Sequence, residues 1–321
     1  MGDKDLVDFF EYQLPIFDEI LAQAKTPLKQ RPFFATMDFI EYCIVDIKNE
    51  SKENMLEKPW FRFFYQQIAE WYSQRYGDAM KGNSEKHALG VVLIYGTPFE
   101  VQIPLSVTDR WESPTERWFC WPNEVLEQEN VLDWIVNPPN FERMSMEELS
   151  SMKTCVIDVV NSIRTLRINL MTATKEDAAL RKLADGIPSH IEKSGNDILS
   201  MSGATISSSV WELHLAMEKA LKLLVRQRGK NPGNTHDLAN LLDKANSLEG
   251  ISLDVALLHD LPSHHDAIRH RYGEAPELAI DRAVMNYRIA LTVVTEVTAA
   301  LSRRFFMKNA RFLIKVPPWQ S

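Results

Sequence analysis

The chain has 321 residues, more than one domain usually holds, so we expect two domains. Hydrophobic residues make up 45% of the chain and charged residues 25%, which is ordinary for a soluble globular protein. The net charge is −8, with the acidic excess in the first 200 residues and a slight basic excess after them. A non-specific nucleic-acid binder usually has a stronger basic excess, so the charge argues against that class.

The sequence shows no signal for a membrane or for secretion. Residues 289–301 form a long apolar stretch, but it is too short to span a bilayer and contains Glu296. The acidic N-terminus lacks the basic and apolar regions of a signal peptide. Three scattered cysteines, Cys43, Cys120 and Cys155, form no CxxC pair. Their odd number favours a reducing compartment, so we predict a cytoplasmic protein that does not bind membranes.

The first 80 residues show helical patterns. Apolar residues recur every three or four positions over residues 33–48, and a second helix is expected over Pro59–Tyr76, with Pro59 in its first turn. Aromatic residues are dense across both segments. Because few basic residues accompany them, we interpret them as a hydrophobic core rather than as a surface on which bases stack.

A β-rich segment follows. Two β-branched runs within residues 87–107 flank a Gly-Thr-Pro sequence and predict a β-hairpin, and residues 117–121 have the composition of a further short strand. Residues 125–136 are typical of a short helix. The stiff NPPN sequence at 137–140 then predicts a boundary. We therefore expect residues 1–140 to form a mixed helix and β-hairpin domain of unknown role.

The next segment has the periodicity of a long helix. Ser145 and Glu148 form a capping box, which closes the free amides at a helix start. The apolar rhythm of residues 152–170 predicts a long helix behind this cap. Gly186 and Pro188 are expected to end or bend that helix.

The rest of the chain is predicted to be helical up to a short tail. Residues 194–209 are rich in Ser and Gly and are expected to form a loop, and a long helix is expected over 279–303. The tail, residues 306–321, contains RFLIKV, which either pairs with a sheet as a strand or docks a partner. Overall the sequence predicts an α+β protein, whose second part, residues 141–305, is an all-α helical bundle.

One predicted helix aligns three ionisable side chains on a single face. The helix that includes Trp211 has His214, Glu218 and Lys222 four residues apart, beside the apolar side that packs into the core. In the simpler interpretation the strip is solvated and Glu218 pairs with Lys222. In the functional interpretation the strip faces a groove and binds a ligand together with the basic segment that follows Ser263.

The start of the next short helix is explained by capping. Thr235 is the expected N-cap, and Asp237 favours the positive helix terminus. His236 and Asp237 also resemble the His-Asp pair of metal-dependent HD-type phosphohydrolases. Such a site needs further ligands, for which His214 and Asp281 are the candidates. We keep a metal-dependent phosphohydrolase as a remote alternative.

The run SHHDAIRHRYG is the densest group of ionisable residues in the chain. Ser263 and Asp266 predict a capping box there. The guanidinium fork matches phosphate geometry, so we expect Arg269 and Arg271 to bind a phosphate, with Tyr272 stacking on a base or packing. No HExxH motif or cysteine framework accompanies the run, so we predict neither a metal ion nor a cofactor.

The order of these segments resembles the HEPN domain, a nucleotide-binding domain of higher eukaryotes and prokaryotes. The resemblance covers about residues 145–305 and is carried by HLAMEKALKLLVRQRG, THDLANLLDKA, AIRHRYG and AIDRAVMNYRIALTVV. It implies an all-α bundle of four or five helices, commonly dimeric. Such domains occur in toxin–antitoxin, antiphage, RNA-processing and nucleotide-sensing proteins.

The sequence departs from the ribonucleases of that family, which carry an Arg, four to six residues and then a His. No such His follows Arg269 or Arg271. We therefore predict a HEPN-like binding or assembly protein that recognises a nucleotide, RNA or an operon-encoded protein partner and dimerises through its bundle. The alternative is a metal-independent ribonuclease in stress response or phage defence, with Arg269, His270, Arg271 and His265 as its candidate catalytic residues.

Overall fold

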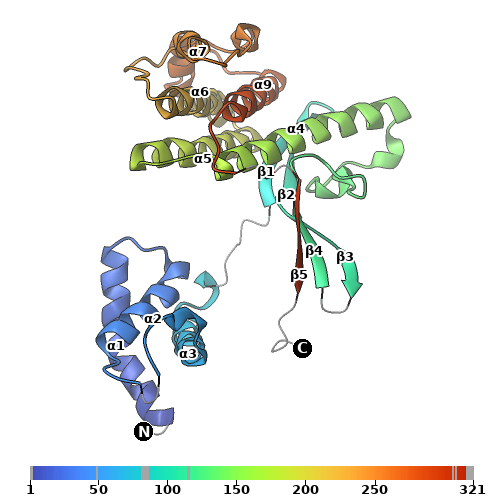
Figure 1. Cartoon of the computed structure of the whole chain (residues 1–321). Coiled ribbons are helices and arrows are strands. Elements are labelled where there is room, and N and C mark those ends of the chain that lie inside the picture. The colour runs from blue at the N-terminus through green and yellow to red at the C-terminus, as the bar shows by residue number, and fades with distance from the viewer. Residues whose placement is uncertain are drawn as a thin grey trace. The chain divides into compact units, whose positions relative to one another are not determined.

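The chain divides into two compact units, Met1–Ser84 and Glu85–Ser321. Helices form most of both units, and the strands belong to the second (Figure 1). The fold is therefore α+β, as predicted. The computed structural model describes residues 3–47, 50–80, 87–113, 116–305, 307 and 309–315.

The described residues of the first unit form helices only. Pro59 begins α3, as predicted, and the helix expected over residues 33–48 is α2, which already ends at Tyr42. The elements are α1 (Asp3–Gln23), η1 (Leu28–Gln30), α2 (Arg31–Tyr42), η2 (Met55–Glu57), α3 (Pro59–Tyr76) and η3 (Gly77–Ala79).

Aromatic side chains hold the three helices of the first unit together. Phe39 of α2 and Phe61, Trp71 and Tyr72 of α3 are buried in one cluster with apolar residues of α1. Phe10 meets Phe39 edge to face, with ring centroids 5.2 Å apart. Such aromatic pairs add about 0.5–1.5 kcal/mol to the gain from burial. The prediction that these aromatic residues form a core is confirmed in part, because Phe33, Phe34, Tyr42, Phe63 and Tyr65 are exposed.

The second unit begins with the predicted β-hairpin. Strands β1 (His87–Ile94) and β2 (Thr97–Pro104) pair antiparallel, with Ile94 opposite Thr97. The two residues between them, Tyr95 and Gly96, have φ angles of 51° and 74°. Two consecutive residues with positive φ are what a tight hairpin turn requires.

The C-terminal tail contributes a strand to a second sheet. Strands β3 (Val107–Ser113), β4 (Glu116–Trp121) and β5 (Ala310–Lys315) form an antiparallel sheet in that order. β5 pairs with β4 along its whole length, with Phe119 opposite Phe312. Both the short strand expected over 117–121 and the strand alternative for RFLIKV are confirmed as far as Lys315; the residues after Lys315 lie outside the described part.

The hairpin belongs to the helical unit, which moves the predicted domain boundary from residue 140 to residue 84. Val91 and Val101 of the hairpin share one buried cluster with α4, α5 and α9. The packing is close at Gly90, where a Cβ atom would lie 2.9 Å from Val159 of α4. The NPPN sequence connects η4 to η5 within the second unit and is not the boundary between the units. Composition does not show that the strands before it pack on the helices after it.

The second unit contains the long helices α4, α5, α6 and α9 and the short helices α7 and α8. The capping box at Ser145 and Glu148 is present at the start of α4, as predicted. The elements are η4 (Val131–Trp134), η5 (Phe141–Arg143), α4 (Met146–Thr172), α5 (Ala178–Leu199), α6 (Gly203–Gln227), α7 (Leu238–Asn246), η6 (Val255–Leu258), α8 (His264–Arg271) and α9 (Ile280–Ala299).

Three local predictions in this unit were wrong. The loop expected over 194–209 is helical except at 200–202. Its small residues instead permit close packing: Ser194 and Ser209 are fully buried, and a Cβ atom on Gly195 would meet Leu89 at 2.3 Å. Gly186 and Pro188 lie inside α5, while α4 ends earlier, at Thr172. Residues 125–136 form only the 3-10 turn η4. The backbone amides of Val125, Leu126 and Leu132 donate to side chains instead of to helical carbonyls.

Arg164 fixes the irregular segment between β4 and α4. Its guanidinium forms a bidentate pair with Glu129, at 2.7 Å for both bonds, and also donates to the carbonyls of Pro104 and Glu124. The ring of Trp134 lies 5.0 Å from the guanidinium carbon. The side chains of Arg164 and Glu129 are 0% and 7% exposed, and these bonds satisfy both partners. The cluster therefore joins β2 and the 122–136 segment to α4.

Candidate functional site

The residues singled out in the sequence converge where α8 and the 235–237 segment cover one side of α6. His214 and Glu218, two members of the predicted strip, are 2% and 6% exposed. The strip is thus buried, which contradicts the interpretation of a solvated strip, although the expected pair of Glu218 with Lys222 is present. The sequence could not show this, because the cover comes from a loop and a helix that follow α6.

Glu218 is the charged centre of the site. One of its oxygens accepts a hydrogen bond from Lys222 Nζ at 2.6 Å, and both lie within 3.1 Å of His236 Nδ1. Burial opposes ionisation of the carboxyl, but the bonds from Lys222 and His236 outweigh it and place the pKa of Glu218 below its ordinary value. Glu218 is therefore an anion that orients the exposed imidazole of His236.

Three histidine rings lie together above this carboxylate. His214 Nε2 is 2.8 Å from the carbonyl oxygen of His236 and 3.1 Å from His264 Nδ1. The rings of His236 and His264 are stacked, 5.3 Å apart and inclined by 11°. Burial lowers the pKa of His214 despite its bond to the His236 carbonyl, so this ring is neutral near pH 7.

Trp211 links the histidines to the basic end of α8. Its ring stacks on that of His214, with the centroids 5.9 Å apart. The guanidinium carbon of Arg271 lies 5.0 Å from the centroid of the same Trp211 ring. Arg271 also lies 5.7 Å from the ring of Tyr272. Cation–π contacts of this kind contribute about 0.5–1 kcal/mol at exposed sites. They hold Arg271 in place while leaving it exposed to solvent.

A cavity of about 390 Å³ adjoins this end of the site. Its wall includes three predicted residues, His270, Arg271 and Tyr272, and the hydroxyl-bearing residues Ser207 and Ser208 from the first turns of α6. Burial lowers the pKa of His270. The volume lies within the usual range for small-ligand sites.

Two predicted residues are not brought into this arrangement. Arg269 donates to the Glu274 carbonyl at 3.2 Å and lies 3.8 Å from Asp266, while His265 is exposed. Neither lines the cavity beside Arg271. The helix α8 has only eight residues, and positions 265 and 269 lie on its outer face.

His236 belongs to the site, although the sequence analysis considered it only as a metal ligand, in the phosphohydrolase alternative. The N-cap of α7 is Asp237, whose side chain accepts a hydrogen bond from the Asn240 amide. Thr235, the predicted N-cap, lies two residues earlier and accepts from the Asp237 amide. His236 lies between Thr235 and Asp237, and its Nδ1 is within 3.1 Å of both carboxylate oxygens of Glu218. Sequence spacing alone cannot reveal this contact, because the two residues lie on different elements.

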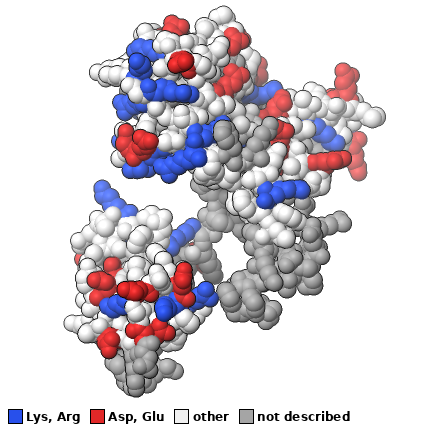
Figure 2. Space-filling view, in the orientation of Figure 1, with Lys and Arg blue, Asp and Glu red and all other residues white. Residues whose placement is uncertain are grey.

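Basic side chains continue from the site toward the end of α6. Arg226 follows Lys222 by one helical turn, and Arg228 and Lys230 follow it. Gln227 donates to the carbonyls of Thr174 and Ser302, so the α4–α5 loop and the end of α9 meet there. Figure 2 shows basic side chains gathered in the region where Figure 1 places α5 and α6, beside smaller acidic groups. The local charge thus exceeds what the overall balance of the chain suggests.

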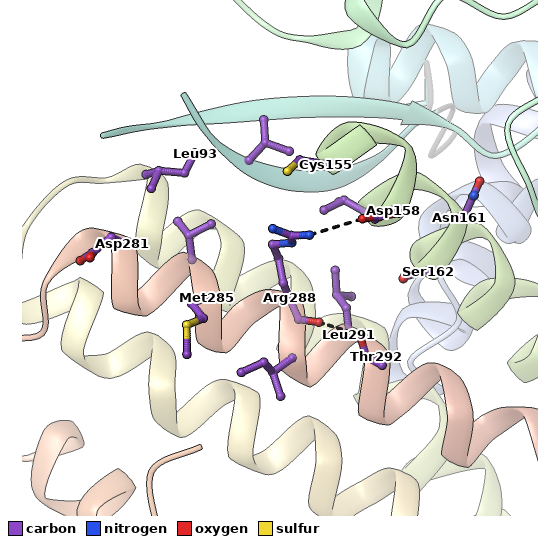
Figure 3. Close-up of a pocket in the computed structure, with 14 residues that line it drawn as sticks. Leu93, Cys155, Asp158, Asn161, Ser162, Asp281, Met285, Arg288, Leu291 and Thr292 are labelled. Atoms are coloured by element: carbon purple, nitrogen blue, oxygen red, sulfur yellow. Dashed lines mark hydrogen bonds and ion pairs between the residues drawn. The ribbon is translucent and has the colours of Figure 1, made fainter. Parts of the chain in front are cut away.

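A larger cavity lies elsewhere, between β1, α4 and α9, and has a volume of about 700 Å³. Figure 3 shows Arg288 reaching from α9 across this cavity to Asp158 of α4, at 3.4 Å. The acidic Asp281 and the thiol of Cys155 also line it. None of the predicted ligand-binding residues takes part, and its one arginine is already paired.

In the described part of the chain, no group of three or more His, Cys, Asp or Glu side chains is arranged to hold a metal ion. The Asp237 carboxylate caps α7, which leaves the His-Asp pair without the geometry of a shared metal site. No helix of the described residues is long and apolar enough to cross a membrane. Comparisons with protein-family models, curated proteins and solved structures find no match to the chain.

Proposed function

We propose that the second unit is a HEPN-like binding module that recognises an anionic partner, RNA or a nucleotide, and that the protein forms a homodimer through its helices. One observation carries the proposal. Arg271 and Tyr272 line a cavity of ligand size, and the guanidinium of Arg271 lies against the rings of Tyr272 and of Trp211, which also packs on the histidine cluster. An exposed guanidinium beside aromatic rings suits a phosphate next to a base.

The charge along α6 favours RNA over a single nucleotide. From Trp211 to Arg226 the helix spans about 22 Å, at 1.5 Å per residue. Arg271 lies over one end of this stretch, and Arg226, Arg228 and Lys230 lie at the other. Several phosphates of a single strand fit along such a length, and each basic side chain that contacts a phosphate releases counterions. The acidic total charge then restricts binding to this face.

Binding is tested with the full chain and fluorescently labelled single-stranded RNA, compared with free nucleotides, by anisotropy at several salt concentrations. We expect Arg271→Ala to weaken RNA binding about tenfold and to lower the salt slope by about one. Arg288→Ala removes the same charge from the cavity of Figure 3 and is the matched control. Equal affinities for the two variants would contradict the proposed site.

If neither RNA nor nucleotides bind the wild type, recognition of RNA or a nucleotide is rejected. Recognition of a protein partner is then the alternative that remains. Sedimentation of the full chain tests the dimer separately. A monomer at all concentrations would remove the homodimer from the proposal without affecting the binding result.

Ribonuclease activity is the second candidate, and the pair of Glu218 with His236 favours it. A buried carboxylate that binds Nδ1 leaves Nε2 of an exposed imidazole available as a general base. In RNA cleavage, His236 would take the proton of the 2′-hydroxyl as its oxygen attacks phosphorus. The bond from phosphorus to the 5′-oxygen would break, and a water molecule would give a proton to that oxygen.

Cleavage is tested on labelled RNA with the wild type and with His236→Ala, for which a loss of about 100-fold or more is expected if His236 is the base. His190→Ala is a matched control, because His190 Nδ1 also meets a glutamate, Glu212, at 2.6 Å, but has no second histidine beside it. Cleavage that survives in His236→Ala, or no cleavage by the wild type, would reject this candidate.

A further inference from the structure

Two buried polar groups face one small cavity beneath the histidine cluster. Asn286 of α9 is 1% exposed, and neither atom of its carboxamide has a hydrogen-bond partner among the described residues. The same holds for Nδ1 of His214. Both residues line a cavity of about 10 Å³ whose other walls are apolar: Val210, Leu213, Met217, Leu261 and Pro262.

The contacts of His214 determine which of its nitrogens carries the proton. A carbonyl oxygen only accepts, so the 2.8 Å contact with the His236 carbonyl requires a hydrogen on Nε2. Because burial keeps this ring neutral, Nδ1 then carries a lone pair. His214 lines the apolar cavity, and this buried lone pair has no donor among the described residues.

Leaving such groups without partners is costly. A buried donor or acceptor without a bond costs about 1–3 kcal/mol, and the two residues that line this cavity carry three such atoms: His214 Nδ1, Asn286 Nδ2 and Asn286 Oδ1. A volume of about 10 Å³ corresponds to the space that one water molecule requires, and a water needs two or more polar partners. The His214 and Asn286 side chains supply these partners.

We propose that one water molecule in this cavity bridges Nδ1 of His214 and the carboxamide of Asn286, and that Asn286 is thereby a positioning residue of the histidine cluster. The water donates one hydrogen to His214 Nδ1 and the other to the Asn286 carboxamide oxygen. Its hydrogen bond favours the tautomer of His214 with the proton on Nε2. An Asn in the middle of an otherwise apolar face of α9 is thus explained.

The tautomer of His214 determines what the exposed rings present to a ligand. Its Nε2 hydrogen also points to His264 Nδ1, 3.1 Å away, which must therefore carry a lone pair. The hydrogen of the His264 ring then lies on Nε2. His236 has the opposite arrangement, because its Nδ1–H donates to the Glu218 carboxylate and its Nε2 carries a lone pair. The stacked pair therefore offers one donor and one acceptor.

This arrangement suits a ligand that pairs an acceptor oxygen with a donor hydroxyl, as a phosphate and a ribose do, and here the inference rests on the proposed function. It favours binding over cleavage. A proton added to Nδ1 of His264 would face the N–H of His214, so His264 acts as a neutral hydrogen-bond donor rather than as an acid.

The tautomers are read directly by long-range ¹H–¹⁵N correlation of the histidine rings in the wild-type full chain. We expect a pyridine-type Nδ1 and a protonated Nε2 for both His214 and His264, and the reverse for His236. A slowly exchanging water with a cross-peak to His214 is expected as well. A protonated Nδ1 on His214 would overturn the proposal, and this result needs neither a variant nor a ligand.

Variants test the role of Asn286. Asn286→Leu fills the cavity and is expected to remove the water signal, to mix the two tautomers of His214 and to weaken RNA binding about two- to tenfold. Asn286→Ser keeps a polar group and leaves room for water, so the wild-type histidine signals should return. Asn169→Leu, which alters another buried Asn of the unit, should destabilise the fold and leave those signals unchanged.

The outcomes separate the two hypotheses. Unchanged histidine signals in Asn286→Leu would overturn the positioning role even if RNA binds well. Conversely, wild-type protein that binds no RNA but shows the expected tautomers and their loss in Asn286→Leu would reject the proposed function and support the inference.

Discussion

Two buried glutamates of the second unit, Glu129 and Glu218, are paired with cations in different ways. Glu129 is held by the bidentate fork of Arg164, which is enclosed on all sides and also satisfies two backbone carbonyls. Glu218 is held by Lys222 and by His236, whose side chain is 54% exposed. The pair of Glu129 with Arg164 is enclosed by protein. The group around Glu218 includes an imidazole, that of His236, which is exposed to solvent.

The difference separates a structural ion pair from a site that can act on a ligand. A fully enclosed pair has no free donor or acceptor to offer, and it is retained because removing one partner leaves the other charge buried. An exposed imidazole held by a buried carboxylate has one nitrogen oriented and the other available. The comparison predicts that variants at Arg164 affect stability alone, while variants around Glu218 affect binding as well.

The largest effect is expected for Arg164→Leu. The change leaves Glu129 buried without its partner, which costs about 3–5 kcal/mol of stability in such pairs. Urea unfolding followed by tryptophan fluorescence measures the loss, and RNA affinity of the folded fraction should be unchanged. The double variant Arg164→Leu, Glu129→Leu should recover part of the stability. If Arg164→Leu lost RNA binding but not stability, the ion pair of Arg164 with Glu129 would not be purely structural, and the two pairs would not differ as proposed.

Glu218→Gln should have a smaller effect on stability and a larger one on binding. The amide keeps the shape but loses the charge, so the bonds from Lys222 and His236 weaken by about 1–3 kcal/mol in total. His236 is then free to rotate, and RNA affinity should fall about tenfold by anisotropy. Unchanged affinity would show that the orientation of His236 does not matter for binding.

The sequence predicted those elements whose signals are local. The hairpin at Gly96, the helix start at Pro59 and the capping box at Ser145 each depend on neighbouring residues, and each was confirmed. The apolar rhythm also identified the buried side of α6. The loop expected over 194–209 failed because small residues have two uses, in loops and in close helix packing, and composition does not distinguish them.

The candidate site could be predicted only in part. Spacing placed His214, Glu218 and Lys222 on one face, and this is what the structure shows. The contact of His236 with Glu218 depends on where α7 begins, and the role proposed for Asn286 depends on how α9 packs on α6. Both are tertiary contacts between segments far apart in the chain, so no pattern within one segment reveals them.

The pH dependence of stability tests whether the buried histidines are neutral. Burial lowers the pKa of both His214 and His270 from the ordinary value of 6.5, so the unfolded chain binds more protons than the folded one below that value. Stability should therefore fall as the pH decreases below 6.5. In His214→Phe the urea midpoint should depend less on pH, and a slope equal to that of the wild type would contradict the burial of a neutral ring.

The smallest effect is expected for Glu212→Gln. Glu212 also lies on α6 and also pairs with a histidine and a lysine, His190 at 2.6 Å and Lys193 at 2.9 Å. Burial opposes its ionisation, but the bonds from these partners lower its pKa. Because Lys193 is largely exposed, the loss should be at most about 1 kcal/mol, with RNA binding unchanged. If Glu212→Gln weakened binding as much as Glu218→Gln does, the general charge of α6 and not the histidine cluster would determine affinity.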